Sequence, residues 1–161
     1  MIDEDKTLLI AYLNSARNHV RAALEGVAES DLRRPVVPSG WSMLGLVRHL
    51  TLDVERFWFG AAMAGGDVAL CQGDEAWQVS PDVTPSDVLD AYTAECALAD
   101  EVIRRTPLEA LPVVWREEWG PMQVEGLLDV IVHVIKETAT HAGHLDVARE
   151  LIDGHQHLVM T

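Results

Sequence analysis

Two histidines and one glutamate fall on a helical stripe that otherwise predicts a protein core. At about 100° per residue, Glu137, His141 and His144 share one side of the last predicted helix with a set of apolar residues: Leu127, Val130, Val134, Ala148 and Leu151. Burying a carboxylate and two imidazoles without partners would cost several kcal/mol. A bound cation would compensate for this cost, because Glu137 and His141 are four residues apart and their side chains emerge one helical turn apart.

A third metal ligand is expected from a facing helix, as in other metal sites of helical bundles. The candidate is His49, which lies midway along the predicted helix 43–63 at the flank of an apolar stripe that includes Leu50 and Phe57. Two imidazoles and one carboxylate suit zinc or a neighbouring first-row metal, and leave coordination positions open for water or substrate. His49, Glu137 and His141 therefore predict a metal centre that performs chemistry.

These residues also have structural interpretations. A single interior histidine more often hydrogen-bonds to protein than to a metal, and Glu137 with His141 could form only a helix-surface pair. Asp53, one turn beyond His49, could accept the free N–H of that imidazole and orient it. The alternative for Asp53 is a solvated or salt-bridged acid.

The sequence does not predict a metal-binding role for the other histidines. His133 lies at the edge of the stripe and is expected to be structural. His19 is left open between the edge of the core and the wall of a pocket. His155 and His157 follow Gly154 and are expected to belong to a solvated tail.

Four stretches of apolar residues recur every three or four positions, which predicts four helices. Ser42 and Thr84-Pro85 are typical helix starts, and Gly154 is a typical C-terminal cap. The segment 66–83 and the proline-bearing segment up to Pro121 are expected to be loops, the latter with short strand or turn structure. The predicted helices are Asp5–Val27, 43–63, 85–105 and a last helix from near Met122 to Asp153. Four helices and no convincing strand predict an all-α bundle.

Composition limits the class of protein. The chain has 161 residues, 48% of them hydrophobic, which is enough for one domain, 1–161, with a full core. Twelve Lys and Arg against 26 Asp and Glu give a formal net charge of −14, so nucleic acid and anionic membranes are poor partners. Cys71 and Cys96 are expected to be free thiols. Without a signal peptide or an apolar spanning run, the expected location is cytoplasmic.

Three segments carry a family resemblance. Residues 40–50, 55–58 and 137–146 together resemble the DinB-like superfamily, and most closely its actinobacterial members that are often labelled mycothiol transferases. The resemblance extends over essentially the whole chain, through residues 150–154. It implies an up-down-down-up four-helix bundle, often a homodimer, in which a metal takes one ligand from the second helix and two from the fourth.

Carried over residue by residue, the resemblance places the metal ligands at His49, Glu137 and His141. The common family version has histidine at the position of Glu137, whereas the thiol-dependent maleylpyruvate isomerase branch has the Glu-x-x-x-His form found here. His144 aligns with a position that is often Gln, which implies a pocket residue or an alternative ligand.

The resemblance also has two departures near the pocket. Lys136 and Thr140 stand where the most similar branch has an acid and an arginine, which leaves the substrate open.

The function that the resemblance implies is a metal-dependent enzyme that uses a low-molecular-weight thiol of the mycothiol type. Zinc is the first choice of metal, with nickel or iron as alternatives. A metal ion can deprotonate a bound thiol, and the thiolate would attack an electrophilic small molecule in S-transfer or in cis-trans isomerisation. His144 would move a proton or orient the sulfur, and Trp41, Arg56 and Trp58 would line the pocket.

Three alternative functions would use the same site residues. A hydrolase would activate water in place of thiol, and an oxygenase would use iron with two histidines and one carboxylate. A non-enzymatic, dimeric metal-binding bundle would close its site with His144 as a fourth ligand. These readings predict different results for His144→Ala, which would remove the metal only from the closed site.

Overall fold

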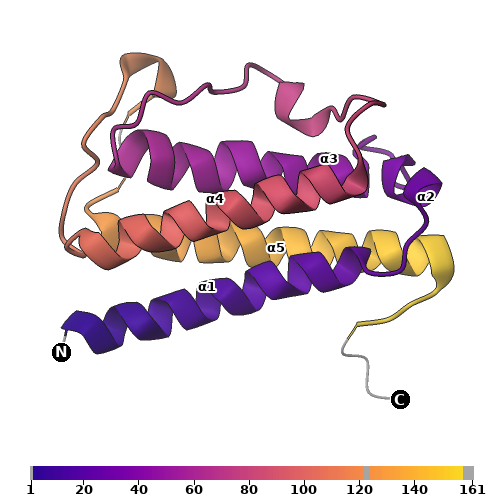
Figure 1. Cartoon of the computed structure of the whole chain (residues 1–161), viewed down its shortest axis with the longest axis horizontal. Helices are drawn as coiled ribbons and strands as arrows, with labels where there is room; N and C mark the ends of the chain where they lie inside the picture. Colours follow the sequence, from indigo (N-terminus) through magenta and orange to yellow (C-terminus); the bar gives the residue numbers. More distant parts are fainter. Residues whose placement is uncertain (1, 122–123, 158–161) are drawn as a thin grey trace.

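Four long helical segments pack side by side in the computed structural model, which describes residues 2–121 and 124–157 (Figure 1). Within these residues no strand is present, which confirms the all-α prediction. No helix in this part of the chain is both long and apolar enough to cross a bilayer. The long segments are α1 (Ile2–Leu24), α3 (Met43–His49) continued by η1 (Leu50–Met63), α4 (Pro85–Arg105) and α5 (Leu127–Asp153).

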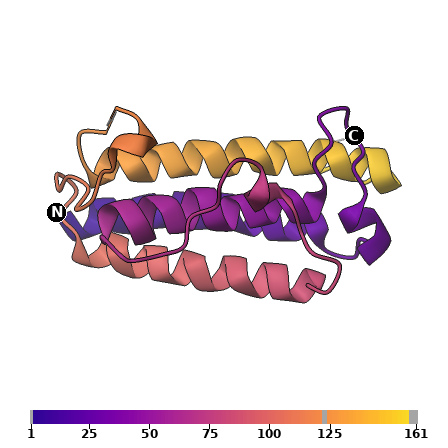
Figure 2. The same ribbon diagram turned by 90° about the horizontal axis from the view of Figure 1, so that it is seen from above.

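The direction of the helices explains the long loop over the bundle. Figure 1 shows α1 and α5 running one way, and α3–η1 and α4 running the other way. Because α3–η1 and α4 point in the same direction, the connection 64–84 has to return along the whole bundle, and Figure 2 shows it passing over η1. It contains the short helix η2 (Glu75–Trp77). The chain also forms α2 (Glu29–Arg33) and η3 (Glu117–Trp119), which the apolar pattern did not predict.

Side-chain caps hold the helix ends that the sequence predicted. The hydroxyl of Ser42 accepts the backbone N–H of Gly45 at 3.1 Å and starts α3. Thr84 and Asp87 form a reciprocal capping box at the start of α4. Gly154, with a φ of 77°, ends α5 in the left-handed conformation that favours glycine. These three predictions are confirmed.

The start of α5 differs from the expectation. The predicted start near Met122 lies outside the described residues, and the helix begins at Leu127. The loop before it supplies the acceptors for the first helical amides: the N–H of Leu127 donates to Ala110 and that of Leu128 donates to Leu108, each at 2.9 Å. A side chain at Gly126 would collide with the Leu108 carbonyl, so glycine permits this close approach. Loop contacts, rather than local periodicity, set this boundary.

The second long helix has the predicted extent but an unexpected internal geometry. From Leu50 onward the backbone takes the wider π-helical form, and at its end the N–H of Ala64 donates to the carbonyl of Phe59 at 3.0 Å. Such turns are rare and often mark functional sites. The wider turn also shifts the inward face, so that Phe59 is buried and Phe57, expected on the core side, is only half-buried. The widening starts directly after His49.

The buried stripe of α5 runs next to Glu137, His141 and His144, and these polar residues do not lie on it. Leu127, Val130, Val134 and Ala148 are fully buried, as predicted, but Leu151 is 59% exposed and was wrongly assigned to the core. The buried stripe continues instead through residues at neighbouring positions: Ile131, Thr138, Ala142 and Leu145. The predicted interior position is wrong for His144, which is exposed. Glu137 and His141 lie at the edge of this stripe, with side chains that are 30% and 14% exposed.

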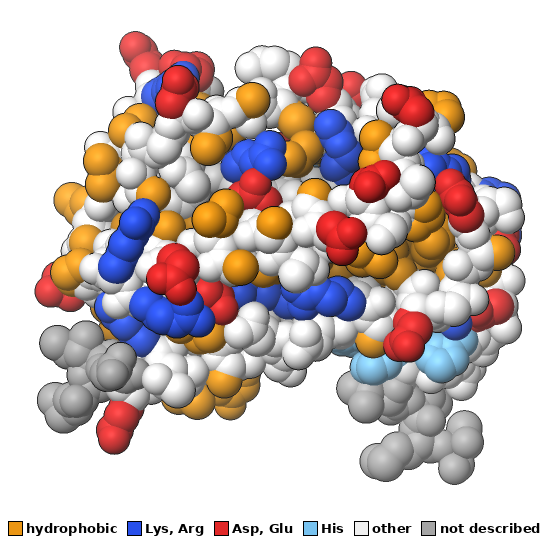
Figure 3. Space-filling model, in the orientation of Figure 1, with side chains coloured by type: hydrophobic (Ala, Val, Ile, Leu, Met, Phe, Trp, Pro, Cys, Tyr) orange, Lys and Arg blue, Asp and Glu red, His pale blue; other side chains and the backbone are white. Residues whose placement is uncertain are grey.

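A buried ion pair that the sequence did not reveal joins three helices. Arg17 of α1 is 0% exposed and donates from Nε and Nη2 to both carboxylate oxygens of Glu55 in η1, each at 2.7 Å. It also donates to Asp100 of α4 at 2.7 Å. Paired and fully hydrogen-bonded, these charges are tolerated inside the bundle, but either one alone would be strongly unfavourable. Elsewhere, acidic and basic side chains intermingle on the face in Figure 3.

Candidate metal centre

Three of the predicted site residues meet where α3 passes α5. His49 is the last residue of α3, and its ring centroid lies 5.1 Å from that of His141, in the middle of α5. The side chains of both are mostly buried, at 16% and 14% exposure. His144 follows one turn later, with its Nδ1 3.4 Å from Nδ1 of His141. Three imidazoles from two helices therefore converge on one edge of the bundle.

A carboxylate orients the first imidazole. Nδ1 of His49 lies 2.9 Å from Oδ2 of Asp53, the contact that the sequence had left open. In a neutral imidazole that donates from Nδ1 to a carboxylate, Nε2 holds the lone pair that can bind a metal. A carboxylate that accepts the second N–H is the usual outer support of a metal-binding histidine.

Glu137 lies beside the imidazoles but is shared with a lysine. Its Oε2 is 3.8 Å from Nε2 of His141, and its Oε1 is 3.2 Å from Nζ of Lys136. Lys136 is one of the two departures from the resembled family. Its ammonium therefore competes with any cation for this carboxylate.

The pKa of His141 is lowered from 6.5 to about 4. Burial is the main cause, because it disfavours the charged imidazole, and the neighbouring His49 and His144 lower the pKa further. Glu137 acts in the opposite direction without reversing the shift. His141 is consequently neutral at pH 7, which is the form that binds a metal.

Two tryptophans form the wall of the imidazole cluster. Trp77 of η2 stacks on His49 with ring centroids 4.1 Å apart and planes 14° apart, and it lies 6.0 Å from His141. Trp41 lies 6.2 Å from His144. Both tryptophans line a cavity of about 540 Å³, together with residues from the segments before α3 and around η2: Ser39, Gly40, Asp74 and Gln78. A small molecule in this cavity would contact the two tryptophans, which in turn contact His49 and His144.

Trp77 is the site residue that sequence reasoning missed. It stands in the long connection 64–84, where the apolar pattern predicts no element. One signal for it exists: Gly45 sits inside a predicted helix, where glycine is unfavourable unless another backbone approaches closely. A Cβ at Gly45 would collide with the carbonyl of Trp77.

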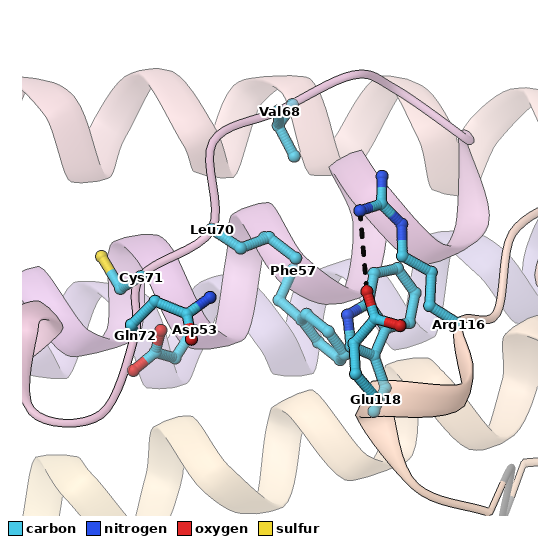
Figure 4. Close-up of a pocket in the computed structure, with 9 residues that line it drawn as sticks. Asp53, Phe57, Val68, Leu70, Cys71, Gln72, Arg116 and Glu118 are labelled. Atoms are coloured by element: carbon cyan, nitrogen blue, oxygen red, sulfur yellow. Dashed lines mark ion pairs between the residues drawn. The ribbon is translucent and has the colours of Figure 1, made fainter.

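A second cavity, separate from the one between Trp41 and Trp77, is lined by Asp53. It has a volume of about 520 Å³ and lies under the 64–84 connection, where Asp53, Gln72 and Cys71 meet at one end and Arg116 and Glu118 at the other (Figure 4). The carboxylate that orients His49 is therefore accessible from this cavity.

Two predicted pocket residues lie away from the imidazoles. Trp58 packs on His133 of α5, with ring centroids 4.8 Å apart, and on Trp115 at 5.9 Å. Burial lowers the pKa of His133 there. Arg56 pairs with Glu95 of α4 at 2.6 Å and lines a third cavity, of about 340 Å³. Of the three predicted pocket residues, Trp41 alone lies beside the imidazole cluster within the described part of the chain.

The donor types suit a divalent transition metal, although the ligand atoms stand apart. Two mostly buried imidazoles, one held by Asp53 and one kept neutral by burial, have the chemistry of zinc ligands. Among the described residues, however, the set that brings three potential ligand atoms within 4.8 Å of one another is a different one: His19, Asp146 and His157. Closing His49, Glu137 and His141 around an ion would therefore require side-chain movement, including release of Glu137 from Lys136.

Neither cysteine provides a nucleophile. Both are free thiols, as predicted. Burial raises the pKa of Cys96 to about 12, and its Sγ lies 3.7 Å from the Glu55 carboxylate, whose charge raises the pKa further. Burial also raises the pKa of Cys71. Because the thiolate is the reactive form, a sulfur nucleophile at this site would have to come from a bound small molecule.

Comparison with known proteins gives one match. Residues 8–154 match the family described as Mycothiol-S-transferase. Neither a curated protein nor a solved structure matches the chain.

Proposed function

Since the chain belongs to the mycothiol S-transferase family, we propose that it is a metal-dependent enzyme that joins a mycothiol-type thiol to an electrophilic small molecule. The observation that carries the proposal is the convergence of His49 and His141 under Trp77. This arrangement combines two imidazoles of metal-binding type with a nearby cavity large enough for a small molecule. The chain directions in Figure 1 support the up-down-down-up arrangement of the four-helix bundle.

The proposed ligands are His49, Glu137 and His141, with zinc as the first choice of metal. A divalent ion held there would lower the pKa of a bound thiol and so favour the nucleophilic thiolate at neutral pH.

The chain's own residues would prepare the site around the thiol. Asp53 holds the His49 ring and leaves Nε2 free to bind. Trp77 and Trp41 cover the imidazoles on the cavity side and exclude water from the sulfur. His144 is exposed, so its ring can accept the thiol proton and pass it to solvent. The electrophile would enter through the cavity between Trp41 and Trp77.

The first experiment is the metal content of untagged protein purified without chelator, measured by elemental mass spectrometry. Wild type is compared with His49→Ala, Glu137→Ala and His141→Ala, and His133→Ala serves as a control on the same face of α5. We expect each of the three ligand variants to hold one equivalent of metal less than wild type, and the control to match wild type. Retention of all metal by the three variants would contradict the proposed centre.

The second experiment measures the reaction. Wild type is incubated with mycothiol and a haloalkyl or α,β-unsaturated carbonyl probe, and the S-conjugate is quantified. The proposal requires a product that depends on both thiol and metal. Consumption of an ester or amide probe without thiol would instead indicate a hydrolase.

A further inference from the structure

A second group of metal-ligating side chains lies on the opposite flank of α5. His19 comes from α1, Asp146 from α5, and His157 from the segment after α5. Nε2 of His19 is 2.9 Å from Oδ1 of Asp146, and the rings of His19 and His157 stack with centroids 3.9 Å apart. Each of the three residues offers a ligand atom within 4.8 Å of the others, and no other set within residues 2–121 and 124–157 does so.

This cluster is separate from the imidazole cluster at His49. His141 turns toward α3, where it meets His49. Asp146, on the same helix, meets His19 of α1 instead. The two clusters share no residue and face different neighbours of α5, so an ion in one does not depend on the other.

The donor set is that of a three-ligand transition-metal site. Two imidazoles and one carboxylate suit zinc and leave a position for water. Asp146 and His19 are about one-quarter exposed. His157 and His19 line a cavity of about 520 Å³ between α1 and α5, which provides an entry path. Within the described chain, no hydrogen bond engages the ring of His157, so its nitrogens are available to an ion.

We propose that His19, Asp146 and His157 form a second binding site for a divalent transition metal such as zinc. The ion would connect three segments that are far apart in sequence: the end of α1, the last third of α5 and the segment after Gly154. Figure 3 shows histidine side chains at the surface over the C-terminal end of α1, where an ion can enter from solvent. The net charge of −14 favours the approach of a cation. The site fastens the segment after α5 to the bundle.

The test is the number of Zn²⁺ equivalents bound, measured by competition with a chromophoric chelator. His157→Ala, His19→Ala and Asp146→Asn are compared with wild type. His155→Ala is the matched control, because it removes an exposed histidine from the same segment and leaves the cluster intact. All four proteins are also tested in the His141→Ala background, which removes the proposed catalytic ion.

In the His141→Ala background we expect one Zn²⁺ equivalent for the His155→Ala control. Loss of a direct ligand in the other three variants should weaken this equivalent by more than about 100-fold, since even outer-shell changes cost 10- to 100-fold. Co²⁺ bound to the same proteins should show a d–d absorption band that disappears with His157→Ala. His157 lies beyond the last helix, so its variant is not expected to affect folding.

Equal Zn²⁺ binding by His155→Ala and His157→Ala, or a Co²⁺ band unchanged by His157→Ala, would overturn the proposal. Failure here leaves the proposed function standing. Conversely, unchanged metal content after His141→Ala with loss after His157→Ala would remove the proposed catalytic centre and keep this site.

Discussion

The Nδ1 atom of His49 lies 2.9 Å from Oδ2 of Asp53, one turn further along the same helix. This contact selects Nε2 of His49 as the atom that can bind a metal and prevents the ring from turning away. Asp53 also lines the cavity under the 64–84 connection. The carboxylate therefore links the orientation of a ligand to the occupancy of a neighbouring cavity.

Asp53→Asn tests this orienting role. An amide can accept from Nδ1 but carries no charge, so we expect metal affinity to fall by about 10- to 100-fold with the fold unchanged. The measurement is Zn²⁺ affinity by chelator competition, with circular dichroism to check helicity. Asp67→Asn, an exposed aspartate of the same connection, is the control. Equal affinities for the two variants would remove Asp53 from the site.

The variant His144→Ala distinguishes between two roles for His144, as a pocket residue or as a fourth metal ligand. Because His144 is exposed and lies beside Trp41, we expect the variant to keep the metal content of wild type and lose most S-conjugate formation. Metal content and turnover are measured on the same preparation. Loss of the metal would instead support a closed, structural site. If neither quantity changes, His144 has no part in the site.

Gly45→Ala tests whether η2 has to approach α3 closely. The added Cβ collides with the Trp77 carbonyl, so Trp77 should move away from His49. We expect weaker thiol binding, seen as a higher KM, with metal content retained. Quenching of tryptophan fluorescence by acrylamide should increase at the same time. Ala62→Gly, in the helix η1, serves as a control for a change in helix stability.

Acid should destabilise the metal-free protein through His141. Its folded-state pKa of about 4 lies below the unfolded value of 6.5, so the unfolded chain binds the proton first as pH falls. The stability is therefore fully present above pH 6.5 and is lost as pH decreases toward 4, by at most about 3 kcal/mol. Urea unfolding at pH 7 and pH 4.5, with chelator, measures it. His141→Gln should show a shallower pH dependence than wild type, and His155→Gln should not.

Arg17→Met should strongly destabilise the bundle. It leaves the Glu55 carboxylate buried without its cation, which costs about 3–5 kcal/mol. Urea unfolding gives the free energy directly. The double variant Arg17→Met/Glu55→Gln should recover part of the loss, because no unpaired charge remains. Arg34→Ala, at an exposed surface pair, should change stability by less than about 0.5 kcal/mol. A small effect of Arg17→Met would mean that water reaches Glu55.

Local sequence signals predicted most of the helical architecture. Periodic apolar residues located the helices 43–63 and 85–105 to their observed ends, and Ser42, Thr84 and Gly154 marked the caps correctly. These signals work because helix periodicity and capping depend on neighbours a few residues away. The first predicted helix, Asp5–Val27, is displaced by three residues at each end.

The sequence predicted the candidate site only in part. A polar residue on or beside an apolar stripe needs a partner that offsets the cost of its burial. This argument singled out His49, Glu137 and His141 as candidate ligands from the sequence alone. The stripe angle did not show that Glu137 would lie against Lys136 or that His144 would be exposed, because those depend on which side of α5 its neighbours cover.

The features that the sequence did not predict depend on contacts between segments that are far apart in the chain. The stacking of Trp77 on His49, the Arg17–Glu55 pair and the His19–Asp146–His157 cluster each join side chains from separate elements. Periodicity describes one helix at a time and carries no information about which residue of another segment will face it. Packing of the helices, and the long connection forced by parallel α3–η1 and α4, brought these residues together.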